Sequence, residues 1–391
     1  MVRLAILADD LTGAADAGGA FARVGLSATL MFGVDPAHDA EVLVRSTGSR
    51  GMPVSEAVAI NRQMAASIPE HALTYKKIDS MLRGHPCEEL GAVLDGRDEW
   101  RALVAPALPV QRRTTVGGYQ RIGGSSRTID LMATFGCRPD LPVRRIDLWT
   151  VQQGGAAVAR AIDAAGIGLL VADAATDGDL AAIARGVIAS GIRVVAGAAG
   201  LAQQLAVELA GNRAAVQNPG SRPGPVLVVA ASRHPATAAQ VDALAASGVA
   251  VVRPSPALLH GDDQDYAPMT GAVGEALAGG RPVVLTTVGM EASRRGGAFV
   301  SATLAEIVAG VAERHAIGGL VLTGGDVAGT VLTRLGAREI VLGGEVQPAI
   351  PWGTLRSDLL PDIPVVTKAG SFGERAVLLE CLAFLREPAP A

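Results

Sequence analysis

The chain has 391 residues and a formal net charge of −4, with 49% hydrophobic and 3% aromatic residues. This length predicts two or three domains, and the acidic balance gives no overall basic field of the kind that attracts nucleic acid. No apolar run reaches the roughly 18 residues that a membrane span needs. Asp9 interrupts the first apolar stretch too early for a signal peptide.

The cysteines Cys87, Cys137 and Cys381 are far apart in the sequence. They form neither a CxxC pair nor a spacing that would bind a metal ion. This usage is typical of a protein in a reducing cytoplasm.

Short apolar strands alternate with helices along the first half of the chain. Strands are predicted at residues 3–8, 27–32, 41–44, 73–78, 102–105, 143–147, 167–172 and 192–196. Helices are predicted at residues 14–24, 54–66, 86–94, 151–165 and 198–209. The alternation predicts a mainly parallel, doubly wound sheet. Residues 117–142 are rich in Gly, Ser and Arg, and they predict either a mobile loop or a β-ribbon.

Two acids, Asp9 and Asp10, follow the first predicted strand directly, with Thr12 and Gly13 after them. Carboxylates at this place can bind a sugar hydroxyl, hold a metal ion or accept a proton. The alternative is that one Asp caps the next helix and the other is simply exposed. Because ligands collect beyond the carboxyl ends of parallel strands, function is the favoured interpretation.

The densest group of polar residues lies between the strand at 73–78 and the helix that Pro86 opens. It consists of Lys76, Lys77, Asp79, Ser80, Arg83 and His85. A cationic strand-to-helix turn suits an anion such as a carboxylate or a phosphate. Solvated cations with a helix cap at Asp79 or Ser80 are the alternative. The loop after residue 105, with Arg113 and Thr114, is compatible with ligand binding and with an exposed basic turn alike.

Residues 211–225 are polar and contain three prolines and three glycines, which predicts a linker. It would separate a domain at 1–215 from a second α/β domain at 226–391. Strands of the second domain are predicted at residues 226–230, 249–252, 282–286, 320–322 and 363–366.

Two strand ends in the second half are rich in glycine, at residues 323–329 (TGGDVAG) and 367–373 (TKAGSFG). Such turns let backbone N–H groups approach a phosphate at a helix N-terminus. Neither matches GxxxxGK[ST] or GxGxxG, so tight turns without a ligand are equally compatible. Ser232, at a third strand end, has a hydroxyl that can donate to a phosphate or ribose oxygen, and Lys368 adds a point charge.

The motifs together resemble the four-carbon acid sugar kinase family. They are ADDLTGAAD (8–16), YKKIDSMLRGHP (75–86), RTT (113–115), DAATDGDL (173–180), GAAGLA (197–202), TGGDVA (323–328) and TKAGSFG (367–373). The resemblance implies two doubly wound α/β domains with an active-site cleft between them. It implies ATP-dependent phosphorylation, with Mg²⁺, of a hydroxyl of a threonate- or erythronate-type acid. It also implies a homodimer. The net charge and the lack of a long apolar run already predict no nucleic-acid partner and no membrane partner.

By the same resemblance the first domain would hold the sugar acid and the second the nucleotide. Asp9, Asp10 and Asp79 are then the candidates that orient the attacking hydroxyl and accept its proton. Lys77, Ser80, Arg83, Arg113 and Thr114 would bind the substrate. Ser232, Gly324, Gly325, Asp326, Val327 and Gly370 would bind ATP, and no metal ligand is assigned.

Two other functions are compatible with the residues. One is a phosphohydrolase that uses the Asp9–Asp10 loop, although the spacing is not DxDxT. The other is a sugar-acid or nucleotide sensor without catalysis.

Overall fold

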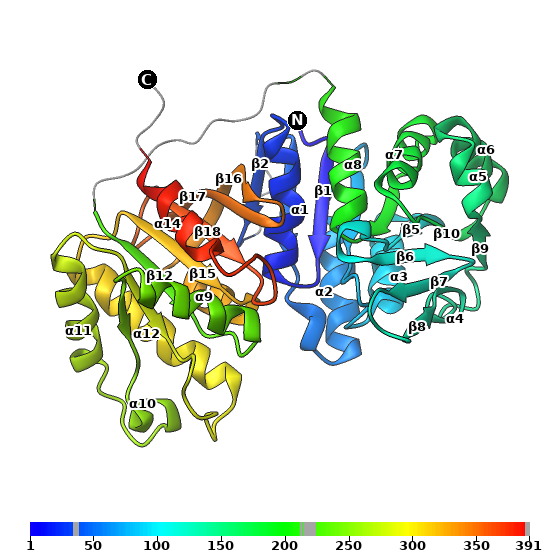
Figure 1. Ribbon diagram of the computed structural model, residues 1–391. Helices are drawn as coiled ribbons and strands as arrows, with labels where there is room; N and C mark the ends of the chain where they lie inside the picture. Colours follow the sequence, from blue (N-terminus) through cyan, green and yellow to red (C-terminus); the bar gives the residue numbers. More distant parts are fainter. Residues whose placement is uncertain (34–38, 212, 214–223, 388–391) are drawn as a thin grey trace. The chain divides into compact units, whose positions relative to one another are not determined.

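The computed structural model describes residues 1–33, 39–211, 213 and 224–387 (Figure 1). The chain forms two compact units, Met1–Thr29 with Asp35–Ala215, and Leu30–Val34 with Val216–Ala391. Both units are α/β, so the predicted fold class is confirmed. Most of the predicted linker, residues 212 and 214–223, lies outside the described residues. The predicted cleft between the domains stays a prediction.

The sheet of the first unit is parallel and buried. Its strands pair in the order β3 (Val42–Ser46), β1 (Leu4–Ala8), β4 (Leu73–Lys77), β11 (Val194–Gly197), β5 (Arg101–Ala105), β10 (Gly168–Ala172) and β9 (Val143–Ile146). Every residue of β1 and β10 is buried, as expected where helices cover both faces of a sheet. β2 (Ala28–Met31) lies where the chain passes from one unit to the other.

Helices of the first unit pack in neighbouring pairs, including α1 with α8 and α2 with α3 (Figure 1). Their bounds are α1 (Leu11–Arg23), α2 (Val54–Ala66), α3 (Pro86–Arg97), α5 (Leu148–Gln152), α6 (Gly155–Ala165), α7 (Asp177–Ser190) and α8 (Ala199–Ala210). Small residues make up most of α1, and all of Leu11–Ala22 is buried. One helix was predicted at 151–165, but Gly154 has a φ of 92° and divides it into α5 and α6.

The Gly- and Ser-rich stretch forms a β-ribbon, one of the two predicted alternatives. Strands β6 (Arg113–Val116), β7 (Tyr119–Ile122) and β8 (Thr128–Asp130) pair antiparallel, and α4 (Leu131–Thr134) follows. Gly117 and Gly118 make the first turn with φ values of 68° and 80°, which glycine adopts at little cost. The carboxylate of Asp173 accepts both of their N–H groups at 2.9 Å. One acid of the DAATDGDL motif therefore fixes this ribbon.

A disulfide joins Cys87 in the first turn of α3 to Cys137 just after α4. This pairing was not predicted, because the fold brings together cysteines that are 50 positions apart. Cys381 is free and buried. The disulfide removes the support that cysteine usage gave to a reducing compartment, and the cytoplasmic location stays a prediction. Within the described residues, no helix has the length and apolar character to cross a membrane.

The second unit combines a parallel sheet with an antiparallel hairpin. The parallel strands pair in the order β13 (Ala250–Val252), β14 (Val283–Thr286), β12 (Val226–Ala230), β15 (Gly319–Thr323) and β18 (Ile363–Lys368). β17 (Ile350–Ser357) pairs antiparallel with both β18 and β16 (Ala337–Gln347). No strand was predicted between residues 335 and 363, where glycines and prolines interrupt the apolar alternation.

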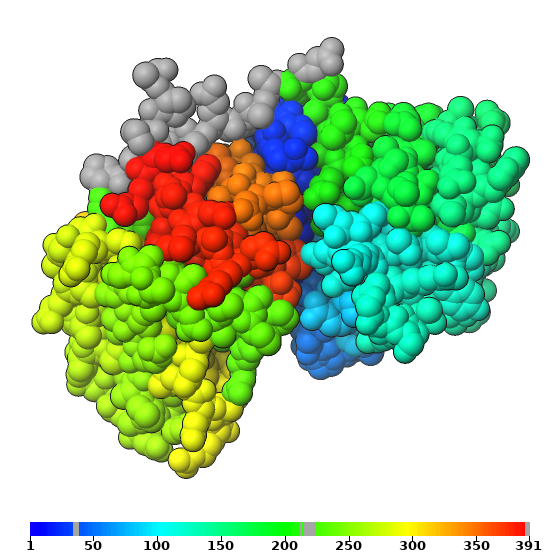
Figure 2. Space-filling view, in the orientation of Figure 1, coloured from blue at the N-terminus to red at the C-terminus, as the bar shows by residue number. Residues whose placement is uncertain are grey.

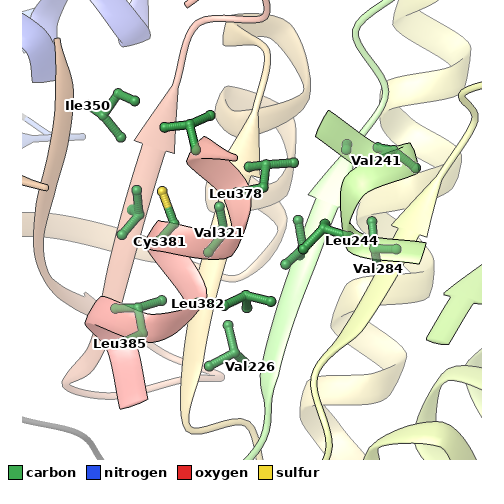
Figure 3. Packing of buried hydrophobic residues seen from close by; sticks show 14 of the residues in the cluster. Val226, Val241, Leu244, Val284, Val321, Ile350, Leu378, Cys381, Leu382 and Leu385 are labelled. Carbon is green, nitrogen blue, oxygen red and sulfur yellow. The ribbon is translucent and has the colours of Figure 1, made fainter. Parts of the chain in front are cut away.

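Helices α9 (Pro235–Ala246), α10 (Pro256–His260), α11 (Ala267–Ala278), α12 (Gly297–Arg314), α13 (Gly325–Arg334) and α14 (Val377–Arg386) complete the second unit. Figure 3 shows its core, where α9 and α14 place Leu244, Cys381 and Leu382 against Val226 and Val321 of the sheet. Figure 2 shows the C-terminal segment, in red, lying against α9, in green, on the surface of this unit. The Gly-rich turn at residues 367–373 is held against α9 by hydrogen bonds.

Candidate active site

Arg50 is the centre of the polar group in the first unit. Because β1 pairs in parallel with β3, the residues that follow the two strands lie side by side. The Arg50 guanidinium donates two hydrogen bonds of 2.8 Å to Asp9 and two of 2.8 Å to Asp10. Such forked pairs fix geometry as well as charge. Arg50 is not among the site residues that were predicted from the sequence.

Asp10 has two structural roles. Its Oδ1 accepts the Gly13 N–H at 2.9 Å and caps α1, and its Oδ2 accepts the Thr12 hydroxyl at 2.8 Å. The helix-cap interpretation is therefore right for Asp10, in addition to its pairing with Arg50. Asp9 is not exposed, since only 3% of its surface is accessible.

Asp79 is held by the residues that follow it. Arg83 donates to its two oxygens from Nε and Nη2, each at 2.8 Å, and the N–H groups of Met81 and Arg83 also donate to Oδ2. Asp79 does not cap α3, whose N-cap residue is His85. Burial raises the pKa of Asp79, but the hydrogen bonds and charge of Arg83 and the charge of Arg50 outweigh it, so the pKa falls to about 2.

The β-ribbon adds a cation to the Asp79 loop. Arg113 donates from Nη1 to the Ser80 hydroxyl, and burial lowers the pKa of Arg113. Its Nε is buried without a hydrogen-bond partner among the described residues. Thr114 is the next residue of β6, and its side chain points to the opposite face of the ribbon from that of Arg113.

The two neighbouring lysines of β4 point to opposite faces of the sheet. Lys77 lies beside Gly13, where a Cβ would be 3.2 Å from Nζ and would overlap Asp10. Lys76 forms a fully buried ion pair of 2.6 Å with Glu89. Glu89 also accepts the Ser49 hydroxyl at 2.7 Å, so this pair supports the turn that carries Arg50.

The first-unit site therefore contains one more cation than it has carboxylates. Its cations are Lys77, Arg50, Arg83 and Arg113, and its carboxylates are Asp9, Asp10 and Asp79. An excess of one positive charge suits a monovalent anion, and the carboxylate oxygens can accept hydrogen bonds from hydroxyl groups. This combination matches a small polyhydroxylated acid.

Three residues predicted to bind ATP meet in the second unit. A Cβ added to Gly370 would overlap the Ser232 hydroxyl, and one added to Gly324 would be 3.8 Å from the Ser232 Cβ. The Gly324 N–H donates to the Lys368 carbonyl at 2.8 Å. Position 370 therefore has no room for a Cβ, and Gly324 has a φ of 100°, which side chains rarely permit.

The first turn of α13 presents free backbone donors beside Gly324. The first intrahelical bond runs from Ala328 N–H to the Gly324 carbonyl at 2.9 Å, so the N–H groups of Gly325, Asp326 and Val327 have no helical partner. Such a helix start suits a phosphate. The Val327 side chain is buried in the core, which leaves only its backbone for a ligand.

Helix α9 fixes the second Gly-rich turn. Thr237 donates to the Gly370 carbonyl at 2.8 Å, and Gln240 donates to the carbonyls of Phe372 and Gly373 at 3.0 and 2.9 Å. Sequence reasoning missed Thr237 and Gln240, since two polar residues inside a helix give no signal of a partner more than a hundred positions away.

No group of three His, Cys, Asp or Glu side chains within the described ranges is arranged to hold a metal ion. Mg²⁺ that arrives with a nucleotide needs few protein ligands, because it keeps water and phosphate oxygens in its shell. The exposed Asp326 at the start of α13 is compatible with such an ion.

Two α/β units, one with a cationic polar site and one with Gly-rich turns at a helix start, are compatible with a protein that binds two substrates. A model described as a sugar-binding N-terminal domain matches residues 4–205, and one described as a nucleotide-binding C-terminal domain matches residues 227–378. The chain belongs to the four-carbon acid sugar kinase family, as the motifs predicted.

Relatives with assigned activities match almost the whole chain. It is 37% identical to a D-threonate kinase of Bordetella bronchiseptica, over 98% of each chain. It is 32% identical to a D-threonate kinase of Salmonella typhimurium, over 99% of each. Other relatives are named 3-oxo-tetronate kinase and D-erythronate kinase. The Haemophilus influenzae protein HI1011 shares the fold, with a TM-score of 0.76 and 22% identity over 97% of this chain and 100% of its own.

Proposed function

We propose that the protein is a kinase that transfers the γ-phosphoryl group of Mg-ATP to a hydroxyl of a four-carbon sugar acid. The observation that carries the proposal is the first-unit site, where Arg50 joins Asp9 and Asp10 beside Asp79 and Arg113. The cationic excess would attract the substrate carboxylate, and the carboxylates would accept hydrogen bonds from its hydroxyls. The names of the relatives support the same reaction.

Arg113 is the side chain we assign to the substrate carboxylate, together with Arg83. Arg113 is half-buried and its Nε has no partner among the described residues, so a bound carboxylate would satisfy it. The Arg83 side chain is 65% exposed and pairs with Asp79, which leaves its outer face for the substrate.

Asp10 is the carboxylate we assign to the attacking hydroxyl. Its side chain is 21% exposed, compared with 4% for Asp9 and 9% for Asp79. The low pKa of Asp79 also makes it a weak proton acceptor. Phosphoryl transfer depends mainly on positioning and on charge stabilisation, so the main task of Asp10 is to orient the hydroxyl. Asp9 would position Arg50.

We assign ATP to the turns of the second unit, with its phosphates at the start of α13 and at Gly370, and Ser232 between them. The expected contacts with the phosphates come from backbone N–H groups. The side chain of Val327 is buried and does not obstruct these groups. When bound, Mg²⁺ would neutralise phosphate charge. The assignment of these residues, the cleft and the homodimer remain proposals.

An ADP-release assay with Mg-ATP and a panel of four-carbon acids tests the function. The panel includes D-threonate, L-threonate, D-erythronate and a blank without acid. D-Threonate is the first choice, because two relatives with 37% and 32% identity carry that name. ADP release that depends on one acid supports the kinase. Phosphate release from phosphate esters without ATP would support a phosphohydrolase, and tight binding without turnover a sensor.

A further inference from the structure

All three lysines of this chain are buried, although lysine is normally exposed. Lys76 and Lys368 have no accessible surface and Lys77 has 6%, while every other cationic residue that carries a permanent charge is an arginine. Lysine differs from arginine because its compact ammonium group loses its proton readily when buried. Lys76 pairs with Glu89 and Lys77 lies in the sugar-acid site. Lys368 belongs to the second unit and has no Asp or Glu partner among the residues that the structure describes.

The Lys368 ammonium closes the turn that carries Gly370. It donates to the Ala369 carbonyl at 2.9 Å and to the Phe372 carbonyl at 3.0 Å. The hydroxyl of Thr237 on α9 donates a hydrogen bond to the Gly370 carbonyl. The carbonyl oxygens of this turn therefore face α9 and Lys368. Among the described hydrogen bonds, the N–H groups of Gly370 and Ser371 have no acceptor, and they remain available for an anion next to Ser232.

The charge of Lys368 is not balanced inside the second unit. Within the described residues it forms no ion pair with an Asp or Glu. The titratable and charged groups on the surrounding elements come from three helices and the turn. They are Asp326 and Arg334 on α13, His234 and Asp242 at the start and in the middle of α9, Glu374 and Arg375 after the turn, and Glu380, Cys381 and Arg386 on α14. Burial lowers the pKa of Lys368 to about 8. Of the groups named, only the buried Cys381 thiol (Figure 3) opposes this by raising that pKa.

We propose that Lys368 is a positioning residue for the nucleotide: its ammonium group shapes the Gly370 turn, and its buried charge is balanced by the phosphates of bound ATP. The inference rests on the proposed function, because it requires the nucleotide at this turn. A buried cation without a counter-ion is unfavourable, and an arriving polyphosphate removes that cost. Lys368 therefore links nucleotide affinity to protonation.

The direction of the linkage follows from the charges. Bound phosphates favour the charged ammonium, so the pKa of Lys368 is higher in the complex than in the free protein. Around pH 8 the free protein must take up protons when it binds ATP. Lys368 is fully protonated below about pH 7, so its contribution to nucleotide affinity should be constant there. That contribution should fall as the pH rises above about 8.

Isothermal titration of Mg-ATP into the full chain at pH 7, 8 and 9, in buffers of different ionisation enthalpy, measures affinity and proton uptake together. At pH 8 the wild type should take up about half a proton more than Lys368→Met. At pH 7 Lys368→Met should bind about tenfold more weakly, as expected for a lost charge-assisted interaction. Lys368→Arg keeps the charge but cannot titrate, so any affinity it retains should lack the fall above pH 8.

Arg281→Met is the matched control, because it also removes one positive charge but lies at the amino end of β14, away from the turns. It should behave as the wild type. Equal affinity and equal proton uptake in Lys368→Met and the wild type would overturn the inference and leave the kinase proposal intact. If Lys368→Met does not fold, absence of proton uptake by the wild type at pH 8 overturns it. A wild type that binds no ATP at any pH would refute both.

Discussion

The guanidinium of Arg50 forms two hydrogen bonds of 2.8 Å with the carboxylate of Asp9, which lies 41 positions earlier in the chain. The parallel pairing of β1 and β3 makes this contact possible. The same guanidinium also pairs with Asp10 and is 4.0 Å from Asp79. One cation therefore connects all three candidate carboxylates of the first unit.

Arg50→Lys should lower turnover by about 100-fold, because lysine keeps the charge but loses the fork that holds two carboxylates in place. ATP affinity should not change, since each hydrogen bond and ion pair of Arg50 among the described residues is with the first unit. Steady-state kinetics for the sugar acid and an ATP titration measure the two effects. Equal loss of ATP binding would contradict the assignment of Arg50 to the sugar-acid site.

Asp10→Asn should lower turnover far more than ATP affinity. Asparagine is as good a helix cap as aspartate, so the start of α1 is preserved and the change removes mainly the negative charge at the substrate hydroxyl. The measurement is kcat at saturating ATP and sugar acid, with the unfolding midpoint as the control for the fold. An unchanged kcat would exclude Asp10 from the reaction.

Acid should destabilise the first unit partly through Asp79. The pKa of Asp79 is about 2 in the folded protein and about 3.9 in an unfolded chain. Its contribution to stability is therefore complete above about pH 4 and is lost as the pH falls through 2. Urea unfolding of the wild type and Asp79→Asn between pH 6 and pH 2 tests this. The difference in free energy of unfolding between the two proteins should shrink toward pH 2. A difference that stays constant with pH would contradict the contribution of Asp79.

Gly370→Ala should weaken ATP binding, because a Cβ at this position overlaps the Ser232 hydroxyl and forces the turn away from it. Gly271→Ala is the matched control, since a Cβ at Gly271 in α11 meets no atom within 4 Å. Titration of Mg-ATP into both variants gives the comparison. If both bind equally well, the nucleotide does not lie at the Gly370 turn.

Loss of the Cys87–Cys137 disulfide should lower the free energy of unfolding by about 2–4 kcal/mol, given the 50 positions between the cysteines. The double variant Cys87→Ser with Cys137→Ser, unfolded in urea, measures the loss. Wild type treated with a reductant should match the variant. Equal stability of oxidised wild type and the double variant would show that this crosslink does not stabilise the fold.

Much of the fold, and those candidate site residues that directly follow a strand, could be predicted from short stretches of the sequence. An apolar strand followed at once by Asp9 or Gly324 is visible in a few consecutive residues, so those strand ends were predicted. The alternation of strands and helices likewise predicted the parallel sheets. The β16–β17 hairpin was missed because Gly343 and Gly344 break its pattern; a Cβ at Gly343 would overlap the Trp352 ring.

Contacts between distant residues were not visible in the sequence. Arg50 reaches Asp9 and Asp10 only after β1 and β3 have paired, and Cys137 reaches Cys87 only after the ribbon has folded back. The burial of Lys368 depends on α9 and α14 packing beside β18. Residue type alone gives no sign of these neighbours, because each depends on which elements pack together.

The most direct test of the account is ³¹P NMR of a reaction that contains the enzyme, Mg-ATP and D-threonate. The kinase predicts a new phosphomonoester resonance that grows together with ADP and is absent without the acid. Release of inorganic phosphate alone, with no ester of D-threonate or of another four-carbon acid, would contradict phosphoryl transfer to a sugar acid.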